Sequence, residues 1–126
     1  MAIRCVRTGL RTATTTTDSY TFAQQQTPIQ ILKIEIVCSA STDFKLYTTE
    51  NDGSTAAEYI LGASGSVVTV NTTKRVYPGR MFSGADGADL TKTEIHYVVD
   101  RPMIVAVSNI AAADTWYMNI YYTVLD

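Results

Sequence analysis

The stretch "TWYMNIYYTV", residues 115–124, decides the fold class, because its side chains alternate in character along its length. Successive side chains of a β-strand point to opposite faces of its sheet. One face of this stretch would carry Trp116, Met118, Ile120, Tyr122 and Val124, and the other Tyr117, Asn119, Tyr121 and Thr123. The pattern predicts a half-buried strand with an apolar inner face and an outer face rich in tyrosine.

The stretch "IQILKIEIVCSA", residues 29–40, shows the same period of two. Leu32, Ile34, Ile36 and Cys38 would share one face, and Lys33 and Glu35 the other. Shorter runs rich in β-branched and aromatic residues lie around these two stretches, separated by turn-forming residues. The runs cover residues 19–23, 43–49, 57–62, 66–71, 74–78, 94–100 and 103–109.

This number of short strands predicts an all-β fold, specifically a two-sheet antiparallel β-sandwich. We favour a jelly roll, with an immunoglobulin-like sandwich as the alternative, because both topologies fit such a series of alternating strands. A chain of 126 residues has the length of one domain. We therefore expect an N-terminal arm over residues 1–18 and a single sandwich domain over residues 19–126.

The charge balance argues against a general nucleic-acid-binding protein. Ten basic and twelve acidic residues give a formal charge of −2, whereas affinity for phosphate backbones depends on an excess of Lys and Arg. The start "MAIRCVRTGL" carries charges where a signal peptide needs an apolar core, and no apolar run is long enough to span a membrane. We expect no nucleic-acid or membrane partner, and free thiols at Cys5 and Cys38.

The stretch "TATTTTDSYTF", residues 12–22, places a dense run of threonines just after three arginines. Threonine suits an extended backbone, and its hydroxyl keeps it out of an apolar core. The segment is either a solvated linker or an edge strand that adds to the sheet of a neighbouring subunit. Its candidate partner contacts are Arg4, Arg7, Arg11, Thr14, Thr15, Thr16 and Thr17.

No catalytic signature is present. His96 is the single histidine and lies in a strand-like run, and "GASGS" lacks the spacing of a nucleophile elbow. A cysteine nucleophile would have to be Cys5 or Cys38 paired with His96, which is distant from both in the sequence. We expect a protein that is not an enzyme and uses no cofactor.

Two acidic loops offer oxygen ligands without the spacing of a calcium site. Asp and Gly together are ordinary turn residues, so we expect no metal. The acids concerned are Glu50, Asp52, Asp86 and Asp89.

Two further features suggest contact surfaces. Arg80, Met81 and Phe82 stand in the loop "YPGRMFSGADGADL", residues 77–90, where the apolar pair either plugs the end of the sandwich or anchors another chain. Tyr117 and Tyr121 form an outward row that suits a protein interface or stacking on a sugar ring, unless a loop covers it.

The organisation of the whole chain resembles the small decoration or cement proteins of tailed bacteriophage heads. The resemblance rests on the threonine-rich segment, the Asp/Gly-rich loop and a last strand that runs into "NIYYTVLD", residues 119–126. It implies a jelly roll or related sandwich, commonly a homotrimer, that binds the major capsid protein or another virion protein on the outer capsid shell. The protein would be made in the host cytoplasm and reside in the virion.

Two alternatives remain open from the sequence. One is a glycan- or receptor-binding module of a phage fibre, for which Tyr117 and Tyr121 would be the stacking residues. The other is a minor structural subunit of the tail or neck, which would use the same contact residues.

Overall fold

The computed structural model describes residues 2–22, 28–48, 59–77 and 98–125, and strands are the regular elements within these ranges. From Thr17 onward they follow the runs expected from the sequence, because alternating side chains and turn residues fix where each strand begins and ends. The strands are β1 (Arg4–Arg7), β2 (Arg11–Thr12), β3 (Thr17–Phe22), β4 (Ile29–Cys38), β5 (Thr42–Thr48), β6 (Tyr59–Leu61), β7 (Val68–Val70), β8 (Thr73–Val76), β9 (Val98–Val99), β10 (Met103–Ser108) and β11 (Thr115–Val124).

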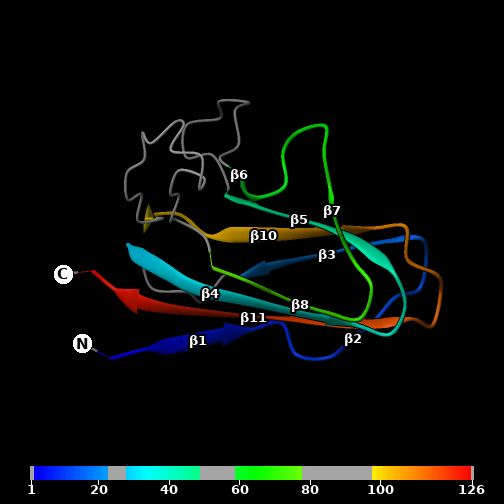
Figure 1. Ribbon diagram of the computed structural model, residues 1–126, viewed down its shortest axis with the longest axis horizontal. Coiled ribbons are helices and arrows are strands. Elements are labelled where there is room, and N and C mark those ends of the chain that lie inside the picture. Colours follow the sequence, from blue (N-terminus) through cyan, green and yellow to red (C-terminus); the bar gives the residue numbers. More distant parts are fainter. Residues whose placement is uncertain (1, 23–27, 49–58, 78–97, 126) are drawn as a thin grey trace, which may run out of the picture.

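The strands form two antiparallel sheets that face each other (Figure 1). The first, which we call the β11 sheet, has the order β1-β11-β4-β8, with β2 also paired to β11 and β9 also paired to β4. The second, the β10 sheet, has the order β3-β10-β5-β6, with β7 also paired to β5. This architecture confirms the predicted all-β fold and two-sheet antiparallel sandwich.

Strands β4 and β11 form the centre of the β11 sheet and pair along their whole length, from Trp116 opposite Cys38 to Val124 opposite Ile29. The register shifts between Tyr121 and Tyr122, which pair with Lys33 and Ile31. Leu32 is therefore the extra residue of a β-bulge, and it is half-buried. The prediction that Leu32 lies on the buried face was wrong, because the bulge interrupts the strict period of two.

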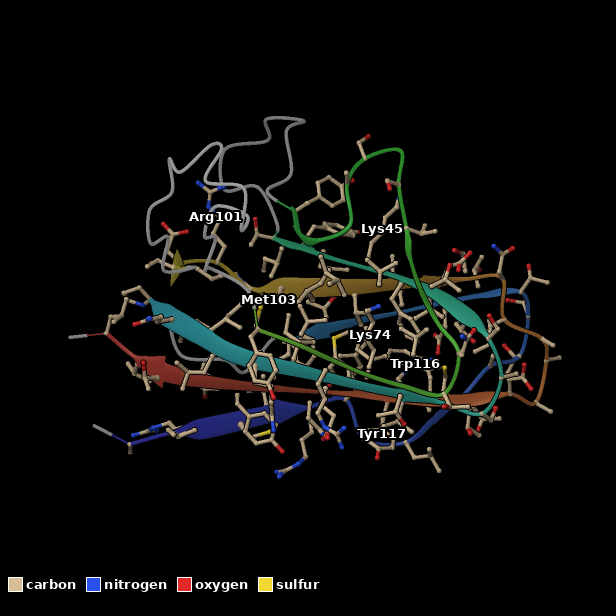
Figure 2. All side chains as sticks on the ribbon, in the orientation of Figure 1. Lys45, Lys74, Arg101, Met103, Trp116 and Tyr117 are labelled. Carbon is tan, nitrogen blue, oxygen red and sulfur yellow. The ribbon has the colours of Figure 1, made fainter. Side chains whose placement is uncertain are left out.

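The core lies between the sheets, where their inner faces interdigitate. Trp116, Met118 and Ile120 of β11 and Phe44 and Leu46 of β5 are fully buried. The Phe44 and Trp116 rings meet edge to face, with centroids 5.7 Å apart, an arrangement that aromatic pairs favour. Figure 2 shows Trp116 between the layers, so the predicted inner face of β11 is confirmed at these positions.

The N-terminal segment, expected as an arm over residues 1–18, is paired within the sandwich. Strand β1 pairs with β11 over four residues, from Arg4 opposite Tyr122 to Arg7 opposite Asn119. Between β1 and β2, the Thr8 N–H donates to the Met118 carbonyl at 3.0 Å, and the Thr8 hydroxyl accepts from the Met118 N–H at 3.0 Å. Residues 4–12 thus complete the edge of the β11 sheet.

The threonine run forms the bend that carries the chain from one sheet to the other. Ala13 is buried and exchanges backbone hydrogen bonds with the loop before β11, donating to Asp114 and accepting from Ala113. Thr14, Thr15 and Thr16 are exposed and lead into β3. The run is therefore a crossover at one end of the sandwich (Figure 1), since the buried Ala13 pins it in place.

Candidate functional site

The outer face of the β11 sheet brings together three of the described candidate residues: Arg7, Tyr117 and Tyr121. Side chains opposite one another on neighbouring strands form rows across β1, β11, β4 and β8. One row is Cys5, Tyr121 and Lys33; the next is Arg7, Asn119, Glu35 and Arg75; the third is Tyr117, Val37 and Thr73.

In the first row, Lys33 lies over the ring of Tyr121, with Nζ 4.5 Å from the ring centroid. This cation–π contact fixes the tyrosine side chain and places a positive charge on the ring face. Cys5 beside them is half-buried, and burial raises the pKa of its thiol. The thiol is therefore mainly protonated at neutral pH.

The second row is a network centred on Glu35. Asn119 Nδ2 donates to Glu35 Oε1 at 3.2 Å, and Arg75 Nε donates to Glu35 Oε2 at 3.1 Å. The Asn119 hydrogen bond, followed by the contact with Arg75, outweighs burial and lowers the pKa of Glu35. Both carboxylate oxygens are thus engaged within the sheet.

In the third row, Tyr117 is half-buried and lies opposite Val37. Figure 2 shows Tyr117 on the side of β11 that faces away from Trp116 and the core. Tyr117 and Tyr121 therefore share the outer face, as the sequence predicted, with Asn119 between them.

Only one of the three N-terminal arginines lies on this face. Arg7 lies opposite Asn119 and faces outward, whereas Arg4 and Arg11 lie opposite Tyr122 and Trp116, whose side chains are buried. Because neighbouring side chains of a strand alternate, a compact basic cluster at the N-terminus is separated onto two sides of the sheet.

Arg11 is held in a contact between the two sheets. Its Nε and second guanidinium nitrogen each donate to a different oxygen of Asp18 at 3.2 Å, and the indole N–H of Trp116 donates to Asp18 at 3.0 Å. The guanidinium also lies 5.3 Å from the Tyr20 ring centroid. Arg11 therefore helps to position Asp18, and its charge is paired within the sandwich.

Thr14 to Thr17 lie at the end of the sandwich where β11 begins, since Thr12 pairs with Thr115. The Thr15 hydroxyl donates to the Thr17 carbonyl at 3.1 Å and accepts from its N–H at 3.4 Å, which stabilises the bend locally. The bend is thus separated from Tyr121, which lies toward the opposite end of β11 beside Cys5.

Several predicted positions lie outside the described residues. They comprise the loop candidates Arg80, Met81 and Phe82, the histidine His96, and the acids Glu50, Asp52, Asp86 and Asp89.

The outer face of the β10 sheet holds a second group that the sequence analysis did not single out. The rings of Tyr47 and Tyr59 lie 5.4 Å apart, and Lys45 Nζ is 6.0 Å from the Tyr59 centroid. Lys45 also donates to the Ser64 carbonyl at 2.8 Å. Next to it is a hollow of about 300 Å³, lined by Thr17, Lys45, Val67, Ala106 and Ser108 among others. The alternation of "DFKLYT", residues 43–48, was the signal that could have revealed Lys45 and Tyr47 on one face of a strand.

Asp43 of β5 also makes polar contacts on this face. It accepts hydrogen bonds from the Thr69 hydroxyl at 2.6 Å and from the side-chain amide of Asn109. These two donors, Thr69 first, lower the pKa of Asp43. The charged carboxylate is therefore stabilised by structural contacts.

Nowhere in the described ranges do three or more His, Cys, Asp or Glu side chains gather in a group that could hold a metal ion. The same part of the chain contains no helix long and apolar enough to cross a membrane.

Comparisons with known proteins give no match: no family model, no curated protein and no solved structure is significantly similar to this chain.

Proposed function

We propose that this protein is a non-enzymatic structural component of a virion, a decoration or cement protein that binds the outer capsid shell and stabilises contacts between capsomers. The observation that carries the proposal is the outer face of the β11 sheet, where Tyr117 and Tyr121 are half-buried among charged side chains on one continuous surface. Tyrosine and arginine at such positions are enriched in protein interfaces. A role in clamping neighbouring subunits requires contact area and no reactive side chain.

We further infer that the sandwich is a jelly roll. Strands β1 and β2 both pair with β11, β6 and β7 both pair with β5, and β8 and β9 both pair with β4. When each of these three couples is counted as one interrupted strand, the sandwich has eight strands that pair in a nested order. The first strand pairs with the last, the second with the next to last, and so on inward through β3–β10, β4–β8 and β5–β6. Nested pairing of this kind supports a jelly roll over the immunoglobulin-like alternative, whose sheets join strands in a different order.

The proposal predicts that the purified protein co-sediments with phage heads from which it has been removed. Replacing Tyr117 and Tyr121 together by alanine should weaken binding by at least tenfold, because truncating an interface anchor costs more than about 1 kcal/mol. The matched control replaces Tyr47 and Tyr59 of the β10 sheet and should bind normally. A wild-type protein that stays in the supernatant would refute the capsid role.

The homotrimer belongs to the same proposal and is tested separately. Light scattering after gel filtration should give three times the chain mass of 13.8 kDa. A mass of one chain at all concentrations, with full binding to heads, would retain the capsid role and reject the trimer.

A second candidate is a glycan- or receptor-binding module of a fibre, favoured by one specific observation. Lys45 lines the hollow on the β10 sheet and lies 6.0 Å from the ring of Tyr59, which in turn contacts Tyr47, so that aromatic rings and a polar group are combined, as they are in sugar sites. Binding on a glycan array that is lost in Tyr47→Ala and kept in Tyr117→Ala would support this module. The reverse dependence, or no glycan signal, would reject it.

A further inference from the structure

Positive charge is concentrated in one of the two sheets. Six of the ten basic residues of the chain lie in strands of the β11 sheet, against one acid, Glu35. The strands of the β10 sheet instead hold Asp18, Asp43 and Lys45. Since the whole chain carries −2, the residues outside the β11 sheet are acidic overall. The six basic residues are Arg4, Arg7, Arg11, Lys33, Lys74 and Arg75.

Part of this charge stands on the outer face of the sheet without an acid to neutralise it. The charge of Glu35 is balanced by Arg75, which leaves Arg7 and Lys33. Arg7 is exposed and makes no ion pair within the described part of the chain. Lys33 contacts the uncharged ring of Tyr121.

We propose that the outer face of the β11 sheet docks onto an acidic protein surface, so that the β11 sheet faces the partner and the β10 sheet faces away from it. The inference rests on the proposed function and adds the orientation of the molecule and the charge of the surface it covers. A basic face on an acidic protein also orients the molecule during approach, because complementary potentials steer association.

An acidic protein surface fits this face better than a nucleic acid does. Stacking of bases needs free aromatic ring faces and a row of cations along the backbone. Here the Lys33 ammonium covers the ring of Tyr121, and the Glu35 network with Asn119 and Arg75 interrupts any continuous row of free cations across the face. Tyrosines and an Asn119–Glu35 network suit the mixed polar and apolar character of a protein interface.

A second copy of this chain, docked face to face, fits less well. Such an isologous contact would place the face that carries Arg7 and Lys33 against the same face of the other molecule. Like charges across an interface are destabilising. The face therefore favours a partner with the opposite charge.

The inference is tested with immobilised poly-L-glutamate as a simple acidic polypeptide and with a thymidine oligonucleotide as the nucleic-acid probe, both at low ionic strength. Lys33→Glu and Lys45→Glu form a matched pair, because each lysine occupies an outward position in the middle of its sheet. We expect Lys33→Glu and Arg7→Glu to weaken binding to poly-L-glutamate by roughly tenfold, and Lys45→Glu to have little effect. Thermal unfolding of each variant verifies that the fold is retained.

Equal losses for Lys33→Glu and Lys45→Glu, or no binding of the wild-type protein, would overturn the inference. Tighter binding to the oligonucleotide than to poly-L-glutamate would overturn it in favour of a nucleic-acid partner. Self-association that Lys33→Glu abolishes, without binding to either probe, would overturn it in favour of a second copy.

The same variants separate this inference from the capsid role. If the wild-type protein binds phage heads and the Lys33→Glu and Arg7→Glu variants bind them as tightly as it does, the capsid role is retained and the proposed orientation is rejected. Wild-type protein that does not bind heads but prefers poly-L-glutamate through Lys33 and Arg7 would reject the capsid role alone.

Discussion

Asp18 is the residue that links the two sheets most directly. It belongs to β3 of the β10 sheet and accepts hydrogen bonds from Arg11 and Trp116, which belong to the β11 sheet. Burial raises the pKa of Asp18, but the donors Arg11 and Trp116 and the Ser19 N–H outweigh it, so the pKa lies below its ordinary value. The folded state therefore favours the charged carboxylate.

This shift predicts a stability that depends on pH. A carboxyl whose pKa is lowered by folding stabilises the protein above its unfolded pKa of about 3.9, and this stability is lost as the pH falls through the folded value. Asp18→Asn should cost about 1–3 kcal/mol at neutral pH, because it breaks hydrogen bonds to a charged group. Denaturant unfolding of both proteins from neutral to acid pH measures the difference, which should shrink at acid pH.

The matched control is Asp100→Asn. Asp100 pairs with Arg101 at 3.7 Å and its side chain is 67% exposed, so the change should cost little at any pH. A difference between Asp18→Asn and the wild-type protein that stays constant down to acid pH would contradict the assigned role of Asp18.

At the residue scale, the sequence revealed the face on which a side chain lies but not its partner. Tyr117 and Tyr121 were placed correctly because the period of two is unbroken over their part of β11. The sequence did not reveal that Arg11 pairs with Asp18, because Asp18 lies across the sandwich. Such a contact depends on how strands of different sheets are placed, which alternation within a strand does not specify.

At the element scale, the pairing of β1 and β2 with β11 has a direct consequence for truncation. Deleting residues 1–17 removes both edge strands, the crossover bend and Arg11, and it leaves one side of β11 without a partner. We expect a large loss of stability and exposure of Trp116, seen as a red-shifted fluorescence spectrum and a lower melting temperature. The substitution Arg7→Ala, on the same strand, is the control and should leave both unchanged.

A truncated protein with wild-type fluorescence and melting temperature would show that the segment is dispensable, as an arm would be. Loss of capsid binding after this deletion would not identify a contact residue, since the deletion also alters the fold. Substitutions on the outer face are for this reason the sharper test of binding.

The turn between β6 and β7 offers a matched pair of glycines. Gly62 has a φ of +82°, and a Cβ there would lie 2.9 Å from the Ser66 carbonyl oxygen, whereas a Cβ at Gly65 would meet nothing within 4 Å. Gly62→Ala should destabilise the protein by more than about 1 kcal/mol, and Gly65→Ala should be neutral or slightly stabilising. Thermal unfolding measures both, and similar effects at the two sites would contradict the strained geometry assigned to Gly62.

Elements were the most predictable scale. Seven of the described strands fall on the runs identified from the sequence beyond β11 and β4, give or take their ends, because β-branched and aromatic residues between turn formers mark strands clearly. The threonine run was less predictable. Its composition suits an extended strip, but buried Ala13 and its bonds to the loop before β11 turn it into a bend.

At the scale of the whole molecule, the two thiols report different levels of opening. Cys5 is half-buried on the edge strand, whereas Cys38 is buried and its thiol donates to the Val70 carbonyl at 3.3 Å. A thiol reagent should modify Cys5 slowly in the folded protein and Cys38 only through unfolding, because core strands open with the global transition. The Cys5→Ser variant isolates Cys38, whose rate should follow the denaturant dependence of unfolding; a rate equal to that of Cys5 would contradict its burial.

The order of strands and the unequal charge of the two sheets could not be read from the sequence. The N-terminal and C-terminal strands pair across nearly the full length of the chain, and long-range pairing leaves no trace in local composition. Arg7, Lys33 and Arg75 are distant in sequence and meet on one face because β1, β4 and β8 belong to the same sheet. Net charge alone, at −2, conceals this polarity.

The bulge at Leu32 has a consequence for how such a chain can change length. On either side of it the buried positions keep their period, with Ile29 and Ile31 before it and Ile34 and Ile36 after it. Loss of Leu32 would restore unbroken alternation and leave every other side chain of β4 on its present face, while loss of one residue elsewhere in the strand would invert all those beyond it. Among related sequences, a deletion of one residue at this point would therefore keep the buried side chains of β4 buried and its outward side chains on the outer face.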